Sequence, residues 1–142
     1  MPNIRVTECR LIDIADVDAE HQELFRLCDG LQHALAAGAS PSDIRSLVHV
    51  LVVHAAAHFA HEERDMHAAR YPHQAWHQRQ HRAARTKVLA YERRLGTGDR
   101  EAAGQLLQFL SRWMNDHIGI ADRMLGAFLR NRRRVETALA SR

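Results

Sequence analysis

Histidine is unusually frequent in this chain, and several histidines have spacings that suit metal binding. The chain has 11 histidines among 142 residues. His77 and His81 are four residues apart, and so are His58 and Glu62. Residues at this spacing lie on one helix face, about 6 Å apart along the axis. Imidazole and carboxylate groups placed in this way can bind a transition-metal ion together, or one ion each. The pattern indicates either a metal site or a polar surface that is rich in histidine by chance.

Capping residues and breakers divide the chain into four predicted helices. Asp18 is a candidate N-cap for the first helix, and Gly38 ends it. Ser40 is a candidate N-cap for the second helix, with Pro41 at its first position and Asp43 three residues after the cap. The expected elements are an N-terminal arm over residues 1–17, helices over about 18–37, 40–70, 71–95 and 99–134, and a C-terminal tail over residues 135–142.

The predicted helices carry apolar stripes with the 3–4 residue spacing of a buried helix face. The stripe of the second helix comprises Ile44, Val48, Leu51, Ala55, His58 and Glu62. That of the third comprises His77, His81, Ala84, Val88, Tyr91 and Leu95. That of the fourth includes Leu106, Leu110, Trp113, His117 and Met124, which are expected to face the core. Short loops between helices of similar length make neighbours antiparallel. We therefore predict an all-α fold, an antiparallel up-down-up-down four-helix bundle that forms one domain over residues 1–142.

The polar members of these stripes gather at one end of the predicted core. The end of the second helix lies beside the start of the third, and the first and fourth helices bring His21 and His117 to the same level. Asp122 follows His117 by five residues, which is about 140° around a regular helix. We therefore predict a local π-type widening between Trp113 and Asp122. The inward ligand-type residues are His21, His58, Glu62, His77, His81, His117 and Asp122.

Seven such groups are too many for one ion but suit a pair. Two octahedral ions that share two carboxylates and a bridging oxygen would leave one ion with all six positions filled and the other with one vacancy. A diatomic ligand could bind at that vacancy. The balance of five imidazoles against two carboxylates favours the ferrous state and reversible binding over oxygenation. Any single one of these histidines could instead be an ordinary hydrogen-bonded core residue.

The remaining histidines and the chain composition set further limits. We expect His61 and His67 to face solvent, leave His73 undecided and assign His54 a possible supporting role. Two cysteines without CxxC spacing make neither a disulfide framework nor a zinc site. The sequence has neither a secretory signal pattern nor a run of 18 apolar residues, so a cytoplasmic location without a membrane span is expected. We interpret the basic stretch RNRRR as a solvated helix end, so no nucleic-acid partner is expected.

Four segments resemble the hemerythrin family over about residues 4–130. HFAHEERDM and YPHQAWHQRQH resemble its signature HFxxEExxM…YPxxxxHxxxH, VDAEHQELF resembles IDxxHxxLF, and WMNDHIGIAD resembles WxxxHIxxxD. The resemblance implies a non-haem protein with two iron ions (Fe²⁺/Fe³⁺) joined by an oxo or hydroxo bridge. It further implies that one iron is held by His77, His81 and His117, that the other, five-coordinate when ferrous, is held by His21 and His58, and that Glu62 and Asp122 bridge them.

The resemblance also implies an O₂ pocket and reversible O₂ binding for storage, delivery or scavenging. The positions that match this pocket are Leu24, Phe59, Trp113, Met114 and Ile118, together with Ala84. Val6 and Ala84 stand where the family has aromatic residues, so a larger or wetter pocket is expected. We expect no enzyme activity and a monomer or weak homo-oligomer. Two alternatives remain open: a sensing module that acts on a separate protein partner, and a di-iron enzyme that reduces peroxide or nitric oxide.

Overall fold

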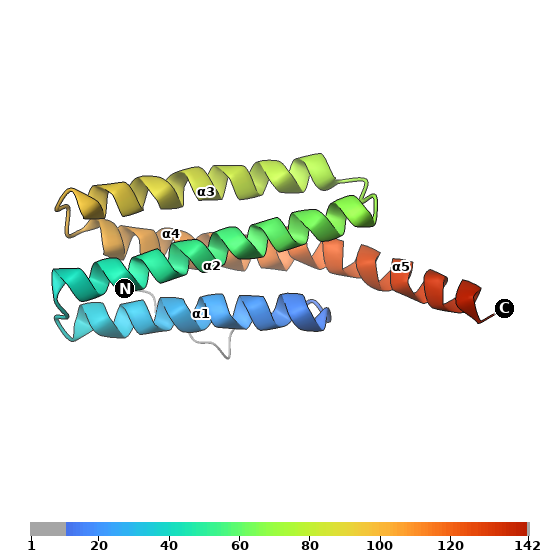
Figure 1. The fold of residues 1–142 in the computed structure, drawn as a ribbon, viewed down its shortest axis with the longest axis horizontal. Helices are drawn as coiled ribbons and strands as arrows, with labels where there is room; N and C mark the ends of the chain where they lie inside the picture. The colour runs from blue at the N-terminus through green and yellow to red at the C-terminus, as the bar shows by residue number, and fades with distance from the viewer. Residues whose placement is uncertain (1–10, 142) are drawn as a thin grey trace.

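The computed structural model describes residues 11–141, and these residues form helices without any strand (Figure 1). The last helix of the bundle is continuous, because α4, the π-helical segment η2 and α5 follow one another without a break. The elements are α1 (Ala15–Ala36), α2 (Pro41–Ala68), α3 (Gln74–Gly96), α4 (Ala102–His117), η2 (Ile118–Asp122) and α5 (Arg123–Ala140).

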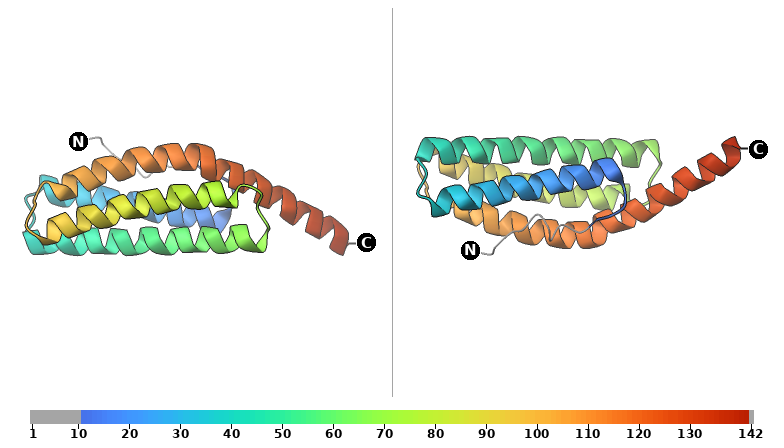
Figure 2. Two further views of the ribbon diagram at one scale, coloured as in Figure 1. Left: turned by 90° about the horizontal axis from the view of Figure 1, so that it is seen from above. Right: turned by 90° about the horizontal axis from the view of Figure 1, so that it is seen from below.

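The helices form the predicted antiparallel four-helix bundle. Contacts join α1 to α2, α2 to α3, α3 to α4 and α4 back to α1, so the four helices enclose one core. Figure 2 shows α5 leaving this bundle and projecting beyond it. The start of α1, the α2–α3 connection and the α4–α5 junction lie toward the same end of the bundle (Figure 1). Within the part of the chain that the structure describes, no helix is both long and apolar enough to cross a membrane.

The boundary between α1 and α2 follows the predicted signals. The Ser40 hydroxyl oxygen accepts a hydrogen bond from the Asp43 amide at 3.1 Å, and Pro41 is the first helical residue. Gly38 adopts a left-handed φ of 68°, which glycine tolerates without steric cost. The start of α3 differs from prediction, because a turn after Tyr71 delays the first helical residue to Gln74.

Asp18 does not cap α1 in the predicted way, because the helix begins three residues earlier, at Ala15. Its buried carboxylate reaches back instead and accepts hydrogen bonds from the amides of Ile12 at 2.8 Å and Asp13 at 3.0 Å. These bonds accompany the left-handed φ of 62° at Asp13, a conformation that Asp tolerates better than most residues. The predicted end of the N-terminal arm at residue 17 was therefore wrong, because α1 already begins at Ala15. Val6, where the family has an aromatic residue, lies outside the described residues.

The segment before α1 packs against α5. Ile12 and Ile14 are buried, and the Arg130 guanidinium donates a hydrogen bond to the carbonyl oxygen of Ile12. Gly126 allows this close approach, because a Cβ atom there would lie 2.9 Å from the same carbonyl oxygen. The glycine thus positions the N-terminal segment across the last helix.

The predicted distortion near Asp122 is confirmed as the π-helical segment η2. The wider turn shifts the phase of the helix that follows, so Leu125 is fully buried and Met124 is 42% exposed. The prediction that Met124 faces the core was therefore wrong. The last helix also continues past the expected end at residue 134 to Ala140, and residues 131–141 are all exposed.

Candidate metal centre

All seven predicted ligand-type side chains come together at one end of the bundle, and none is more than 4% exposed. Every helix of the bundle contributes, because α1 provides one residue, α2 and α3 provide two each, and the α4–η2 segment provides two. The residues are His21, His58, Glu62, His77, His81, His117 and Asp122.

The ligand atoms divide into two groups, and within each group they lie within 4.8 Å of one another. One group contains three histidines and the other contains two, while both carboxylates belong to both groups. The first comprises Glu62, His77, His81, His117 and Asp122, and the second comprises His21, His58, Glu62 and Asp122. Each group could hold a metal ion, and the two groups share both carboxylates.

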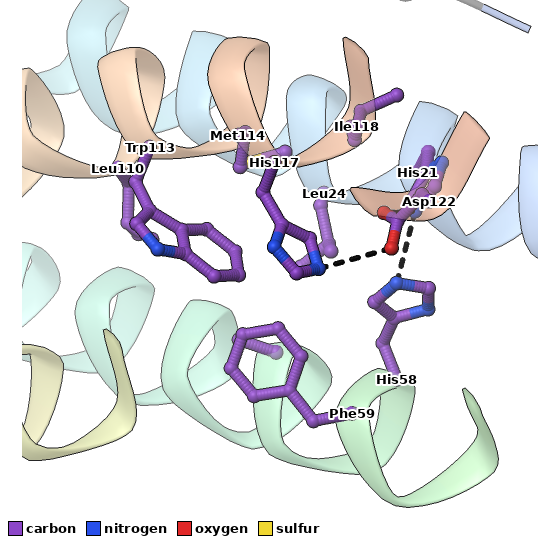
Figure 3. Close-up of a pocket in the computed structure, with 11 residues that line it drawn as sticks. His21, Leu24, His58, Phe59, Leu110, Trp113, Met114, His117, Ile118 and Asp122 are labelled. Carbon is purple, nitrogen blue, oxygen red and sulfur yellow. Dashed lines mark hydrogen bonds and ion pairs between the residues drawn. The ribbon is translucent and has the colours of Figure 1, made fainter. Parts of the chain in front are cut away.

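Asp122 has the geometry of a bridging carboxylate. Its Oδ1 atom lies 3.0 Å from Nε2 of His77 and 2.9 Å from Nε2 of His117. Its Oδ2 atom lies 3.0 Å from Nε2 of His21, in the other group. Figure 3 shows Asp122 between the imidazoles of His117 and His21. Each group therefore receives one oxygen of the same carboxylate.

Two pairs of imidazole nitrogens have the spacing of adjacent metal ligands. Nε2 of His21 lies 3.0 Å from Nε2 of His58, and Nε2 of His77 lies 3.0 Å from Nε2 of His117. Two nitrogens that each bind an ion at about 2.1 Å, at a right angle, are about 3.0 Å apart. The pairs therefore fit neighbouring positions of an octahedron.

Glu62 also lies between the groups, but it approaches both through one oxygen, and its oxygens lack ordinary hydrogen bonds. Its Oε1 atom is 3.2 Å from Nε2 of both His58 and His81. These distances are short, but among the described residues neither oxygen of Glu62 or Asp122 has a well-directed hydrogen bond. A buried carboxylate without partners is costly, and a cation at the shared centre would satisfy it. The imidazole-rich donor set fits a transition metal such as iron.

The charges of the cluster also suit cations. Burial opposes the charged form of His58, but the nearby carboxylates of Glu20 and Glu62 outweigh it and raise the pKa to about 10. For His77, burial is likewise outweighed by Asp122 and Glu62, and the pKa rises to about 9. Burial and the charge of Glu62 would raise the pKa of Asp122, yet the surrounding histidines lower it to about 2. Without metal, protonated imidazoles therefore balance the two carboxylates.

A further set of side chains orients three of the imidazoles. The Nδ1 atom of His58 lies 3.2 Å from Glu20, that of His81 lies 3.3 Å from Glu63, and that of His117 lies 2.8 Å from Gln80. Such contacts fix the ring so that Nε2 faces the centre. The sequence analysis missed these three residues. The available signal was that each directly precedes or follows a residue of the cluster along the chain.

The other histidines divide differently from the prediction. His61 is not simply solvated, because its side chain is only 26% exposed and its Nδ1 atom is hydrogen-bonded to Glu20. His54, His67 and His73 are exposed. His54, for which a supporting role was possible, is thus exposed on α2 rather than buried beside the cluster.

A small cavity of about 10 Å³ lies beside the cluster, next to His21 and His58 (Figure 3). Its apolar wall includes five predicted pocket residues and two that the sequence analysis missed. The wall comprises Leu24, Ala55, Phe59, Leu110, Trp113, Met114 and Ile118.

Ala84 is buried but does not line this cavity. The cavity is lined by residues of α1, α2, α4 and η2, and α3 contributes no residue to its wall. The expectation that Ala84 enlarges the pocket was therefore wrong for this cavity. With about 10 Å³ it has room for one water-sized molecule at most.

Comparisons with known proteins agree with this geometry. Residues 13–129 match the family model described as the hemerythrin HHE cation binding domain. A bacteriohemerythrin of Ralstonia nicotianae (strain ATCC BAA-1114 / GMI1000) is 29% identical over 132 residues, which cover 93% of each chain. A bacteriohemerythrin of Stenotrophomonas maltophilia (strain R551-3) is 29% identical over 107 residues, 75% of this chain and 69% of that protein. The family model spans most of the chain and includes every residue of the cluster, so the protein belongs to the hemerythrin family.

Proposed function

We propose that the cluster holds two iron ions and that the protein binds O₂ reversibly at the ion held by His21 and His58. In this proposal His77, His81 and His117 hold the second ion, and Glu62 and Asp122 bridge the pair. The relatives named bacteriohemerythrin and the match to a cation-binding domain support the assignment.

The position of the cavity carries the proposal. The apolar cavity touches His21 and His58, both histidines of the group with fewer histidines, but only one histidine of the other group, His117. That group offers one donor fewer than the other, so the open position and the cavity coincide. When bound, a pair of ferrous ions supplies the two electrons that O₂ takes up reversibly.

The protein's own residues keep this position dry and fixed. Leu24, Met114 and Ile118 are each at most 5% exposed and form an apolar wall. Phe59 stacks on His81 with ring centroids 4.2 Å apart, and Trp113 stacks on His117 at 4.3 Å. An apolar, closed site limits water and proton access, which would otherwise promote irreversible oxidation.

One observation also favours a sensing role. Asp122 ends η2 and directly precedes α5, whose exposed end projects from the bundle (Figure 2). A change at the bridge could therefore alter a contact of α5 with a separate partner. No comparable observation favours a peroxide- or nitric oxide-reducing enzyme, because among the described residues the titratable groups that line the cavity all belong to the proposed ligand set.

Anaerobic loading with Fe²⁺ followed by O₂ cycling tests the proposal. The metal-free protein should take up two iron ions per chain and develop an oxo-to-ferric charge-transfer band when O₂ is added. The band should disappear under vacuum and return with fresh O₂. A single bound iron, or bleaching to a ferric form that vacuum does not reverse, would contradict reversible O₂ binding.

A further inference from the structure

A second group of metal-ligand side chains lies outside the cluster, on the surface between α1 and α2. Asp16 comes from the first turn of α1, and His61 and Asp65 lie one turn apart on α2. One ligand atom from each of the three lies within 4.8 Å of the others. The group is partly shielded, since the side chains of His61 and Asp65 are 26% and 27% exposed.

The distances in this group suit metal ligands better than hydrogen bonds. Nε2 of His61 lies 3.6 Å from Oδ2 of Asp16 and 3.5 Å from Oδ2 of Asp65. Both distances are at or beyond the limit for a hydrogen bond. Two ligands that each bind a tetrahedral ion at about 2.0–2.1 Å are about 3.4 Å apart. The two distances from His61 therefore suit two ligands of one small cation, and the third ligand atom lies within 4.8 Å of both others.

Two further features mark the space as a site. The Oδ2 atom of Asp65 is shielded from solvent and has no hydrogen-bond partner among the described residues. The opposite nitrogen of His61, Nδ1, is hydrogen-bonded to Glu20. A carboxylate behind a histidine in this way fixes the ring and raises its basicity toward a metal. Glu20 also holds His58, so one carboxylate orients an imidazole of each site.

The local charge favours a cation. Asp16, Glu20 and Asp65 surround one imidazole, and in the described part of the chain their ion pairs are with histidines alone. An ion of charge +2 would balance the two carboxylates that point at the space.

We propose that Asp16, His61 and Asp65 form a second binding site, distinct from the di-metal cluster, for one divalent cation of the Zn²⁺ type. Three protein ligands leave the fourth tetrahedral position to water, on the exposed side of Asp16. The site joins the first turn of α1 to α2. It does not depend on the metal or the function of the inner cluster.

Zinc content after equilibrium dialysis of the full chain tests this site. The wild-type protein should retain one zinc ion per chain more than His61→Gln or Asp16→Asn. His67→Gln is the matched control, because it removes an exposed imidazole from the same helix. Zinc in the inner cluster is common to all four proteins, so the difference reports the outer site alone, whether or not the inner cluster binds iron.

The Asp16→Asn variant should fold like the wild type, because the Asp16 side chain is 56% exposed. A loss of zinc in this variant therefore cannot be attributed to misfolding. In zinc-soaked crystals, an anomalous peak at the zinc edge should lie between Asp16, His61 and Asp65. Equal zinc content in the wild type and both ligand variants would overturn the proposal. A zinc peak elsewhere on the protein, without a zinc peak between these three residues, would also overturn the proposal.

Discussion

Asp122 follows His117 by five residues, yet its carboxylate oxygen lies 2.9 Å from Nε2 of that histidine. The π-helical segment η2 makes this possible, because its i→i+5 hydrogen bonds widen the turn and bring residues five apart closer to one face. A regular helix would turn Asp122 away from His117 by about 140°. The π-helical distortion therefore lets the continuous α4–η2 segment place both His117 and Asp122 in the same cluster.

Asp122→Ala should lower both metal content and metal-free stability. Removal of a buried charge partner leaves His21, His77 and His117 without their shared carboxylate, at a cost of about 3–5 kcal/mol. Urea unfolding of the metal-free protein measures this cost, and metal analysis should find fewer than two iron ions per chain. Wild-type stability together with two bound iron ions would show that Asp122 is not a bridge.

The stability of the metal-free protein should fall as pH rises. The folded-state pKa values of His58 and His77, about 10 and about 9, lie above the ordinary value of 6.5. A raised pKa stabilises the fold fully below about pH 6.5, and this contribution is lost as pH rises through about 9 and 10. Thermal unfolding between pH 6.5 and 10 should show a falling midpoint. An unchanged midpoint across this window would show that the two imidazoles are not held charged.

Below about pH 4, the stability of the metal-free protein should depend on the carboxylates of the cluster instead. Burial would raise the folded-state pKa of Asp122, but the surrounding histidines keep it at about 2, below its ordinary 3.8. A lowered pKa contributes stability above about pH 3.8 that is lost as pH falls through about 2. Asp122→Asn removes this group, so the variant should lose less stability than the wild type between pH 4 and 2, as measured by urea unfolding at each pH. Parallel losses in the two proteins would contradict the assignment.

Gly126→Ala should destabilise the protein, whereas Gly30→Ala should not. A Cβ at Gly126 would lie 2.9 Å from the carbonyl oxygen of Ile12, and the resulting strain costs about 1–3 kcal/mol. A Cβ at Gly30, inside α1, meets nothing within 4 Å, so alanine should stabilise by about 0.5–1 kcal/mol. Denaturant unfolding of both variants checks the difference in sign. Similar effects at the two glycines would contradict the close packing of the N-terminal segment on α5.

Ala55→Leu should block the cavity without removing the metal. Ala55 lines the cavity beside His21 and His58, and the added atoms exceed its volume of about 10 Å³. The variant should hold two iron ions, lose about 1–3 kcal/mol of stability through overpacking and take up O₂ at least tenfold more slowly. Ala57→Leu, on the exposed side of α2, is the control. Stopped-flow oxygenation measures both, and equal rates would show that O₂ reaches the iron by another route.

The fold was largely predictable because its signals are local. Ser40 with Asp43 and the left-handed Gly38 define helix ends through contacts within a few residues. The seven ligand-type side chains were predictable because helical spacing and antiparallel packing place them at one level. The π-helical segment was predictable because Asp122 could not otherwise reach the cluster.

What the sequence could not predict depends on contacts between distant segments. Asp18 looks like a helix cap, but its partners are the amides of Ile12 and Asp13, whose position depends on packing against α5. His61 looked solvated because its partners Asp16 and Glu20 come from another helix. Met124 was misplaced because the π turn moves every later residue by one position around the helix.

The central claim is that seven side chains hold two iron ions, and anomalous diffraction at the iron edge tests it most directly. A crystal of the iron-loaded protein should show two peaks that share Glu62 and Asp122, one beside His77, His81 and His117 and the other beside His21 and His58. A single peak, or iron outside these two groups, would contradict the account.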